Sequence, residues 1–294
     1  MYKVVNDNCF RWMQKQEEDS IDAIVTDPPY GVVEYSSEEL KKKRSGKGGI
    51  WRLPPVMDGC IRQPQPRFSV INESPEKLQN LQDFFEDFGE QAMHILKPGG
   101  HVMLASTSLL EDYVSVALRR SGLERRGEVI RIVKTFRGGD RPKGHEKEFP
   151  NVTVIPRGNW EPWLIFRKPI SEHTVSENLK KWGTGGLRRT SEGSPFTDVI
   201  YVDKTPKRER LIDNHPSIKP QELMRLLVHA SLPLGKGTVL DPFMGSGSTI
   251  AAAEAQGFNS IGVEIDKEYF DAAKIAIPEL AKFRFEDDQT LNVL

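Results

Sequence analysis

The sequence has few cysteines, no long apolar run and almost no net charge, and each shortage excludes a class of protein. Two cysteines, Cys9 and Cys60, are too few for a disulfide framework or a zinc site, and they favour a reducing, cytoplasmic setting. The first residues, MYKVVNDNCFRW, include no apolar signal segment, and no run of about 18 apolar residues predicts a membrane-spanning helix. We therefore expect a cytoplasmic protein without a membrane partner.

The composition is that of a globular protein with a large core. Apolar residues make up 37% of the 294 positions, and the length fits one large domain or a domain with an inserted lobe. Because the formal net charge is −1, the whole-chain charge does not indicate a polyanionic partner. Only the distribution of the charged residues can do so.

Hydrophobic spacing predicts two α/β units. In the first unit we expect a strand near Val4 and Val5, a strand at 21–25, a helix at 76–96, a stop and turn at 97–100, a strand at 101–105 and a helix at 109–118. In the second we expect helices at 221–232, 247–257 and 267–277, with strands at 238–241 and 260–265. Strands that alternate with helices indicate an α/β fold with a doubly wound, mostly parallel sheet.

Three polar, glycine-punctuated segments interrupt this rhythm, at 31–75, 137–150 and 169–213. Connections of this length inside a compact domain are usually functional or mobile. We interpret 31–75 as an insertion of this kind.

A glycine-rich turn follows the strand that ends at Asp241. Glycines such as Gly245 and Gly247 let a backbone approach a ligand closely, and the first N–H groups of the next helix attract anions. Glu264, at the end of the following strand, is placed to accept hydrogen bonds from ribose hydroxyls. The turn is neither a P-loop nor a complete GxGxxG motif, so taken alone it could be a tight strand–helix connection.

The tetrapeptide Asp27-Pro28-Pro29-Tyr30 ends another apolar strand. Proline cannot continue a central strand, so the chain must leave the sheet there. Taken alone, the motif could be a strand-ending turn. Open α/β sheets, however, bind their ligands at the carboxyl ends of strands, where this motif lies.

The segment DPFMGSGST (241–249), followed by GVEID (262–266), resembles the S-adenosylmethionine-binding motifs of amino-methylating DNA methyltransferases. NHPSIKP (214–220) is similar to the family's HPTQKP-like motif, and ILKPGG, HVMLAS and NWEPWLIF add to a resemblance over about two thirds of the chain. The resemblance implies a Rossmann-like methyltransferase fold with inserted DNA-recognition segments. It also implies S-adenosyl-L-methionine as cofactor and double-stranded DNA as substrate.

By this resemblance Glu264 holds the ribose, and Ile265 or Asp266 lies beside the adenine of the cofactor. Ser217 and Lys219 are candidates to bind the cofactor carboxylate, and either Asp7 or Asn8 contacts the amino group of the cofactor's adenine. The full set of implied cofactor-binding residues is Asp7, Asn8, Cys9, Asp27, Ser217, Lys219, Asp241, Pro242, Phe243, Gly245, Ser246, Gly247, Ser248, Thr249, Glu264, Ile265 and Asp266.

The catalytic residues are then Asp27, Pro28, Pro29 and Tyr30. The lone pair of an exocyclic amino group is delocalised into its base, and two acceptors on its N–H bonds help to free that lone pair. Asp27 supplies a carboxylate and Pro28 a carbonyl, the two prolines stiffen the backbone, and Tyr30 offers a face on which a flipped base can stack. No metal and no covalent enzyme intermediate are required.

The catalytic motif precedes the cofactor motif, which resembles the circularly permuted β-class order. This order predicts a catalytic half at 1–168, a target-recognition region at 169–213 and a cofactor half at 214–294. Asp as the first residue of DPPY favours adenine-N6 over cytosine-N4 as the target. Methylation at cytosine C5 is set aside, because neither Cys9 nor Cys60 follows a proline.

The basic residues cluster outside the expected sheet. A surface of this kind contacts DNA phosphates, and the predicted contacts are Lys41, Lys42, Lys43, Arg44, Arg137, Arg141, Lys143, Lys180, Lys181, Trp182, Arg188 and Arg189. Trp182 is either a stacking residue or a local anchor. A non-catalytic regulatory subunit is a further alternative, and a cognate restriction enzyme and a homodimer are possible partners.

Overall fold

The computed structural model describes residues 1–29, 56–57, 60–61, 75–133, 142, 144–154, 156–190, 193–212 and 218–284. Most of the insertion expected at 31–75 lies outside these residues. So do the predicted site residues Tyr30, Lys41, Lys42, Lys43, Arg44, Arg137, Arg141, Lys143 and Ser217.

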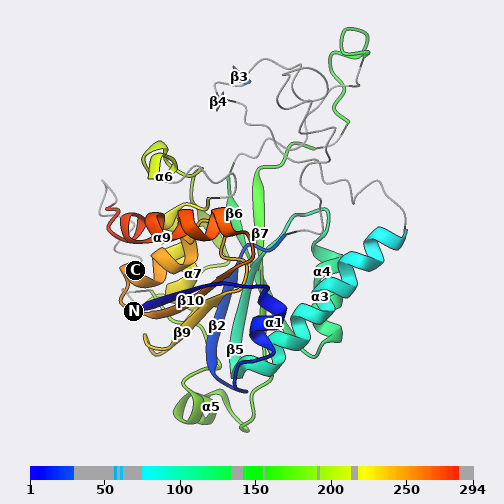
Figure 1. Cartoon of the computed structure of the whole chain (residues 1–294). Helices are drawn as coiled ribbons and strands as arrows, with labels where there is room; N and C mark the ends of the chain where they lie inside the picture. Colours follow the sequence, from blue (N-terminus) through cyan, green and yellow to red (C-terminus); the bar gives the residue numbers. More distant parts are fainter. Residues whose placement is uncertain are drawn as a thin grey trace.

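An eight-stranded sheet forms the centre of the described structure (Figure 1). Its spatial order is β1 (Tyr2–Asn6), β10 (Asn259–Glu264), β9 (Thr238–Asp241), β2 (Ile21–Thr26), β5 (Leu96–Ala105), β7 (Trp160–Arg167), β6 (Glu124–Ile132) and β8 (Val199–Tyr201). The first five strands are parallel, β7 is antiparallel to both of its neighbours, and β8 is parallel to β6. The expected doubly wound, mostly parallel sheet is therefore confirmed. A separate hairpin pairs β3 (Val56–Met57) with β4 (Cys60–Ile61).

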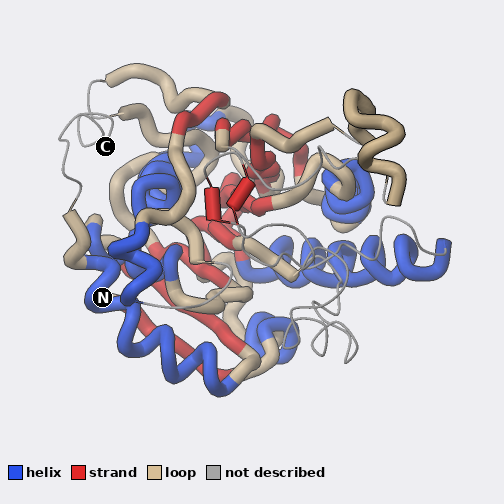
Figure 2. The backbone as a smooth tube through the Cα atoms, turned by 90° about the horizontal axis from the view of Figure 1, so that it is seen from above, coloured by secondary structure: helices blue, strands red, loops and turns tan. Residues whose placement is uncertain are grey.

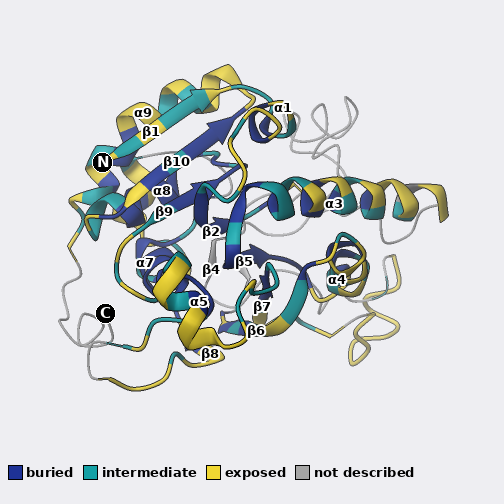
Figure 3. Cartoon of the chain, turned by 90° about the horizontal axis from the view of Figure 1, so that it is seen from below, coloured by how far each residue is buried: buried dark blue, intermediate teal, exposed yellow. Residues whose placement is uncertain are grey.

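Helices cover both faces of the sheet (Figure 2). One face packs against α1 (Cys9–Met13), α3 (Pro75–Ile95) and α4 (Glu111–Arg120), and the other against α7 (Gln221–Ser231), α8 (Ser248–Ala255) and α9 (Lys267–Ala281). Side chains alternate between these two cores along β2, where Ile24 faces α3 and its neighbours Ala23 and Val25 face α7. Figure 3 shows the central strands β2, β5 and β9 mostly buried, β1 partly exposed, and the outer surfaces of α3 and α9 exposed.

The turn expected at 97–100 is instead a bulge inside β5. Ile21 pairs with Leu96 and Ala23 with His101, so the four residues Lys97–Gly100 lie opposite the single residue Asp22. Gly99 has a φ of +83°, and a Cβ there would lie 2.8 Å from the Gly185 Cα. The Gly99 N–H still donates to the Lys168 carbonyl, which is why the strand continues through the proline and glycines.

Three strands, β6, β7 and β8, lie in segments for which the sequence predicted no strand. β6 has the sequence ERRGEVIRI, in which charged residues outnumber the apolar ones. Arg131 in this strand is nevertheless buried, because its guanidinium pairs with Glu161 and donates to the Val202 carbonyl.

All three predicted sequence divisions contribute strands to this one sheet. β1 from the amino-terminal division pairs with β10, and β8 from 169–213 pairs with β6. The assignment of functions to these divisions stays a prediction. Within the part of the chain that the structure describes, no helix is long and apolar enough to span a membrane.

Candidate active site

The carboxyl ends of β2, β9 and β10 meet at one edge of the sheet, because these three strands are parallel neighbours. β2 leads into Asp27, β9 ends at Asp241 and β10 ends at Glu264. The Thr26 hydroxyl donates to the Asp241 carboxylate at 2.7 Å. This hydrogen bond joins the end of β2, just before Asp27-Pro28-Pro29, to the start of the glycine-rich turn, which lies far away in the sequence.

The glycine-rich turn is held in a conformation that side chains disfavour. Gly245 has a φ of +50° and Gly247 a φ of +80°, and a Cβ on Gly247 would lie 2.5 Å from Ile277 Cγ1. Gly247 immediately precedes α8, so the first N–H groups of that helix point toward this edge. The local geometry is therefore that of a turn shaped to receive a ligand group.

Glu264 holds this turn in place. One of its carboxylate oxygens accepts the Gly245 N–H at 2.8 Å, and the other accepts the Asp266 N–H at 2.8 Å. Each oxygen can accept a further hydrogen bond, which leaves capacity for a ribose hydroxyl. The contact with ribose stays a prediction. Asp266 caps α9 by accepting the N–H groups of Glu268 and Tyr269, and Ile265 is exposed beside it.

The segment from Asp7 to Cys9 lies against the end of β10, since the Asp7 N–H donates to the Glu264 carbonyl at 3.1 Å. Asp7 pairs with Arg11, whose hydrogen bond lowers the pKa of the Asp7 carboxyl. Asn8 caps α1 by accepting the Arg11 N–H at 3.1 Å. Burial raises the pKa of Cys9 to about 12, so this thiol stays neutral. Both Asp7 and Asn8 have local partners, and which of them contacts a cofactor stays open.

An aromatic wall borders the turn on the α3 side. The Phe243 ring lies 5.9 Å from that of Phe84 and 5.7 Å from that of Phe88, measured between ring centroids. Pro242, Ser246, Ser248 and Thr249 are buried in the turn and the first residues of α8. The sequence predicted a helix at 76–96, but the proximity of Phe88 to Phe243 depends on how α3 packs on the sheet.

A chain of four charged side chains crosses the same edge. Lys219 Nζ lies 3.1 Å from Asp27 Oδ2 and 2.5 Å from Glu161 Oε1, and Arg131 Nη1 lies 2.9 Å from Glu161 Oε2. Pro28 is buried and Pro29 is exposed. Lys219 was predicted to bind a cofactor carboxylate, but here its ammonium contacts two protein carboxylates.

These contacts control the charge states at this edge. Burial acts to raise the pKa of Glu161, but Lys219 and Arg131 outweigh it and lower that pKa to about 2. Burial likewise acts to lower the pKa of Lys219, and the carboxylates of Asp27 and Glu161 raise it overall. Burial raises the pKa of Asp241 to about 6.

Glu161 and Arg131 were not predicted from the sequence as members of the site. A usable signal was present, because Glu161 is the one acidic residue in the apolar run WEPWLIF. A carboxylate in a buried strand requires a cationic partner or a hydrogen bond.

The described candidates for DNA contact lie at the opposite edge of the sheet. Lys180, Lys181 and Trp182 belong to α5 (Val175–Trp182), which packs against the amino-terminal end of β5 and lies below the sheet in Figure 1. Trp182 donates to the Ser171 hydroxyl at 2.8 Å, and Lys181 pairs with Glu172. The contacts favour the local-anchor interpretation of Trp182.

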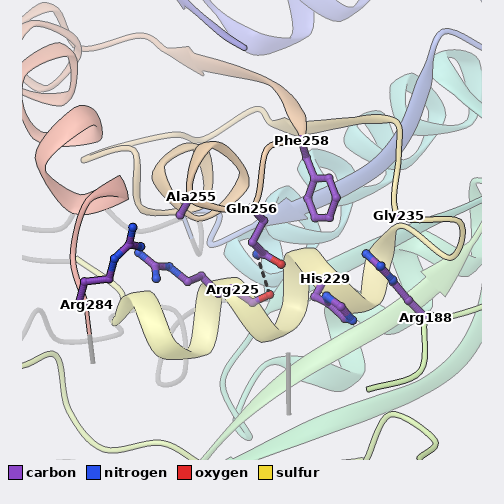
Figure 4. A pocket seen from close by; sticks show the side chains of 8 residues that line it. All are labelled: Arg188, Arg225, His229, Gly235, Ala255, Gln256, Phe258 and Arg284. Atoms are coloured by element: carbon purple, nitrogen blue, oxygen red, sulfur yellow. Dashed lines mark hydrogen bonds between the residues drawn. The ribbon is translucent and has the colours of Figure 1, made fainter. Parts of the chain in front are cut away.

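Arg188 lies at this edge as well, in a cavity of about 380 Å³ beside α7 (Figure 4). Arg225, His229 and Arg284 line the same cavity. Arg189 is exposed, and its guanidinium donates to the Gly193 carbonyl at 2.7 Å. DNA contact by these residues stays a prediction.

The fold and this edge define an α/β protein that brings a glycine-rich turn and an acidic DPP motif together. The N6/N4 methyltransferase family, described as DNA methylase, matches residues 21–275. The chain therefore belongs to this family. It is a DNA methyltransferase that uses S-adenosylmethionine as its methyl donor.

Individual relatives agree with this assignment over most of their length. The chain is 34% identical to the type II methyltransferase M.MthZI of Methanothermobacter thermautotrophicus, covering 93% of this chain and 76% of that protein. It is 26% identical to M2.DpnII of Streptococcus pneumoniae, covering 92% and 87%. The crystal structure of the M1.HpyAVI–SAM complex shares the fold, with a TM-score of 0.58 at 17% identity over 94% of this chain and 99% of that one.

Proposed function

We propose that the enzyme methylates the N6 amino group of adenine at a specific DNA sequence. The supporting observation is the hydrogen bond between Thr26 and Asp241, which joins the DPP motif to the glycine-rich turn. A methyl donor on this turn would lie beside an amino group held by Asp27. The motif order supports a β-class arrangement, in which the target-recognition region lies between the two motifs.

S-adenosylmethionine supplies the methyl group on a sulfonium when it is bound. The Gly245–Thr249 turn and the start of α8 fit the methionine part, because the backbone there is open and its N–H groups attract a carboxylate. Glu264 fits the ribose, since its oxygens lie at the carboxyl end of β10 next to the turn. The remaining role of the protein is to position the acceptor.

On the acceptor side, Asp27 and the Pro28 carbonyl would each accept one N–H of the target amino group. Two acceptors pull this nitrogen toward a tetrahedral geometry and free its lone pair for in-line attack on the methyl carbon. The base must first leave the duplex, and Tyr30 is the proposed stacking surface for it. As the new N–C bond forms, the bond between the methyl carbon and the sulfonium would break and leave its electron pair on sulfur, and the surplus proton on the nitrogen would then pass to solvent.

Adenine is preferred because Asp, rather than Ser, begins the DPPY motif. Cytosine-N4 methylation is the second candidate, since its amino group would meet the same two acceptors and the family includes both activities. A non-catalytic regulatory subunit is less consistent with this site, because Asp27 and the glycine-rich turn are both intact and adjacent. The named relatives are type II methyltransferases, which supports a cognate restriction enzyme as a partner.

The test is transfer of labelled methyl groups from S-adenosylmethionine to DNA, followed by nucleoside analysis. We expect N6-methyladenine from the wild type and no product from Asp27→Ala, while binding of the cofactor changes little. Asp112→Ala, which removes an exposed acid on α4, is the matched control. Label found in N4-methylcytosine would show that the target is cytosine, the second candidate. An active Asp27→Ala variant would refute the role of this carboxylate.

A further inference from the structure

Glu161 lies in β7, an interior strand between β5 and β6, and the buried residues that follow it in this strand, Trp163 to Phe166, are apolar. Its side chain is only 16% exposed. Glu161 and Arg131 are direct partners across β6 and β7, and their side chains form an ion pair at 2.9 Å. Burying a charge in such a strand is costly, so its position calls for an explanation beyond packing.

Lys219 connects this buried acid to Asp27. Its ammonium touches both carboxylates, at 2.5 Å from Glu161 and 3.1 Å from Asp27, and lies over the Trp163 ring at 5.9 Å from the centroid. Its backbone N–H donates to the Ser248 hydroxyl at 3.3 Å. The lysine is thus held at its backbone by the glycine-rich turn and at its ammonium by two acids.

The four side chains balance as two carboxylates and two cations. Arg131 is held in place, because its guanidinium also donates to the carbonyls of Val202 and Asp203. It cannot move together with Lys219 if the lysine shifts. Removing the charge of Glu161 would therefore leave Asp27 as the one acidic side chain that pairs with Lys219 among the residues that the structure describes. The ammonium could then shift toward Asp27 and compete with the target amino group for its oxygens.

We propose that Glu161 is a positioning residue for methyl transfer, acting through Lys219 on the Asp27 carboxylate. The Glu161 contact holds Lys219 so that it anchors Asp27 Oδ2, which turns Oδ1 toward the target N–H. The low pKa of Glu161 agrees with this role, because the anchor stays ionised at every pH at which the enzyme can be assayed. The inference rests on the proposed role of Asp27.

A double-mutant cycle between Glu161 and Lys219 tests this coupling. The readouts are the single-turnover rate of methyl transfer, the Kd for S-adenosylmethionine and the thermal midpoint of unfolding. Glu161→Gln keeps the size and most hydrogen bonds of the side chain but removes its charge. We expect a loss of at least about tenfold in rate, with a change of less than about twofold in cofactor affinity.

The double variant with Lys219→Met should be no slower than Lys219→Met alone, since Glu161 acts only through the lysine. The control Glu128→Gln removes a half-exposed acid that pairs with Arg125 on β6, and it should keep the wild-type rate. A Glu161→Gln rate within about twofold of wild type, or losses that multiply in the double variant, would overturn the proposal.

If Glu161→Gln does not fold, Glu161→Asp replaces it, because the shorter acid keeps the charge and loses the reach. The expected loss is then at least about fivefold in the wild-type background and under about twofold with Lys219→Met. Asp27→Ala is measured in the same assay. An active Asp27→Ala variant shows that the proposed function fails, whereas an inactive Asp27→Ala beside a fully active Glu161 variant shows that this inference alone fails.

Discussion

Replacing Asp241 with asparagine should stabilise the protein at pH 8 and leave its stability unchanged near pH 4. Burial raises the pKa of this carboxyl from its ordinary value of 3.8 to about 6. Between these two values the native state holds more protons than the unfolded state, so the free energy of unfolding falls as the pH rises. The shift of about two units corresponds to about 3 kcal/mol of lost stability above pH 6.

Asparagine removes this cost because it carries no charge at any of these pH values. Its carbonyl oxygen can still accept from the Thr26 hydroxyl and the Phe243 N–H, the two hydrogen bonds that Asp241 Oδ1 accepts now. Urea unfolding of wild type and variant at pH 4, 6 and 8 measures the difference. A stability difference that is the same at pH 4 and pH 8 would refute the reasoning, because it could not come from the charge of Asp241.

Two further predictions concern Gly247 in the glycine-rich turn and the two lysines of α5. Gly247→Ala should destabilise the protein by at least about 2 kcal/mol and weaken binding of S-adenosylmethionine, because the new Cβ meets Ile277 at a φ of +80°. Gly257→Ala is its control, with a φ of +73° and open space around the new Cβ, and equal losses in the two variants would refute the packing argument. Replacing Lys180 and Lys181 with alanine should leave the salt dependence of DNA binding unchanged, since α5 lies at the edge opposite Asp27. A slope reduced by about two would instead place DNA phosphates at α5.

Much of the fold could be predicted because its signals are local. The apolar run at 21–25, the glycine at Gly247 and the periodic spacing before Lys97 each predict one element without knowledge of the others. β6 was not predicted because its sequence, ERRGEVIRI, has few apolar residues, and the strand forms through its pairing with β7 and β8. The bulge at Lys97–Gly100 was not predicted either, because the Gly99 N–H donates to the carbonyl of Lys168, which is distant in the sequence. This hydrogen bond replaces those that a turn would make.

The sequence by itself determined which residues lie at the ends of strands, and therefore that Asp27, Asp241 and Glu264 could share one edge of a parallel sheet. It also indicated the family, since DPPY and DPFMGSGST are short contiguous motifs that can be recognised without knowledge of the fold. Only the tertiary structure decided that Lys219 joins Asp27 to Glu161, and that α5 lies at the far edge. The physical reason is that charge pairing is non-local: Asp27, Arg131, Glu161 and Lys219 come from distant parts of the chain and meet only after the sheet has formed.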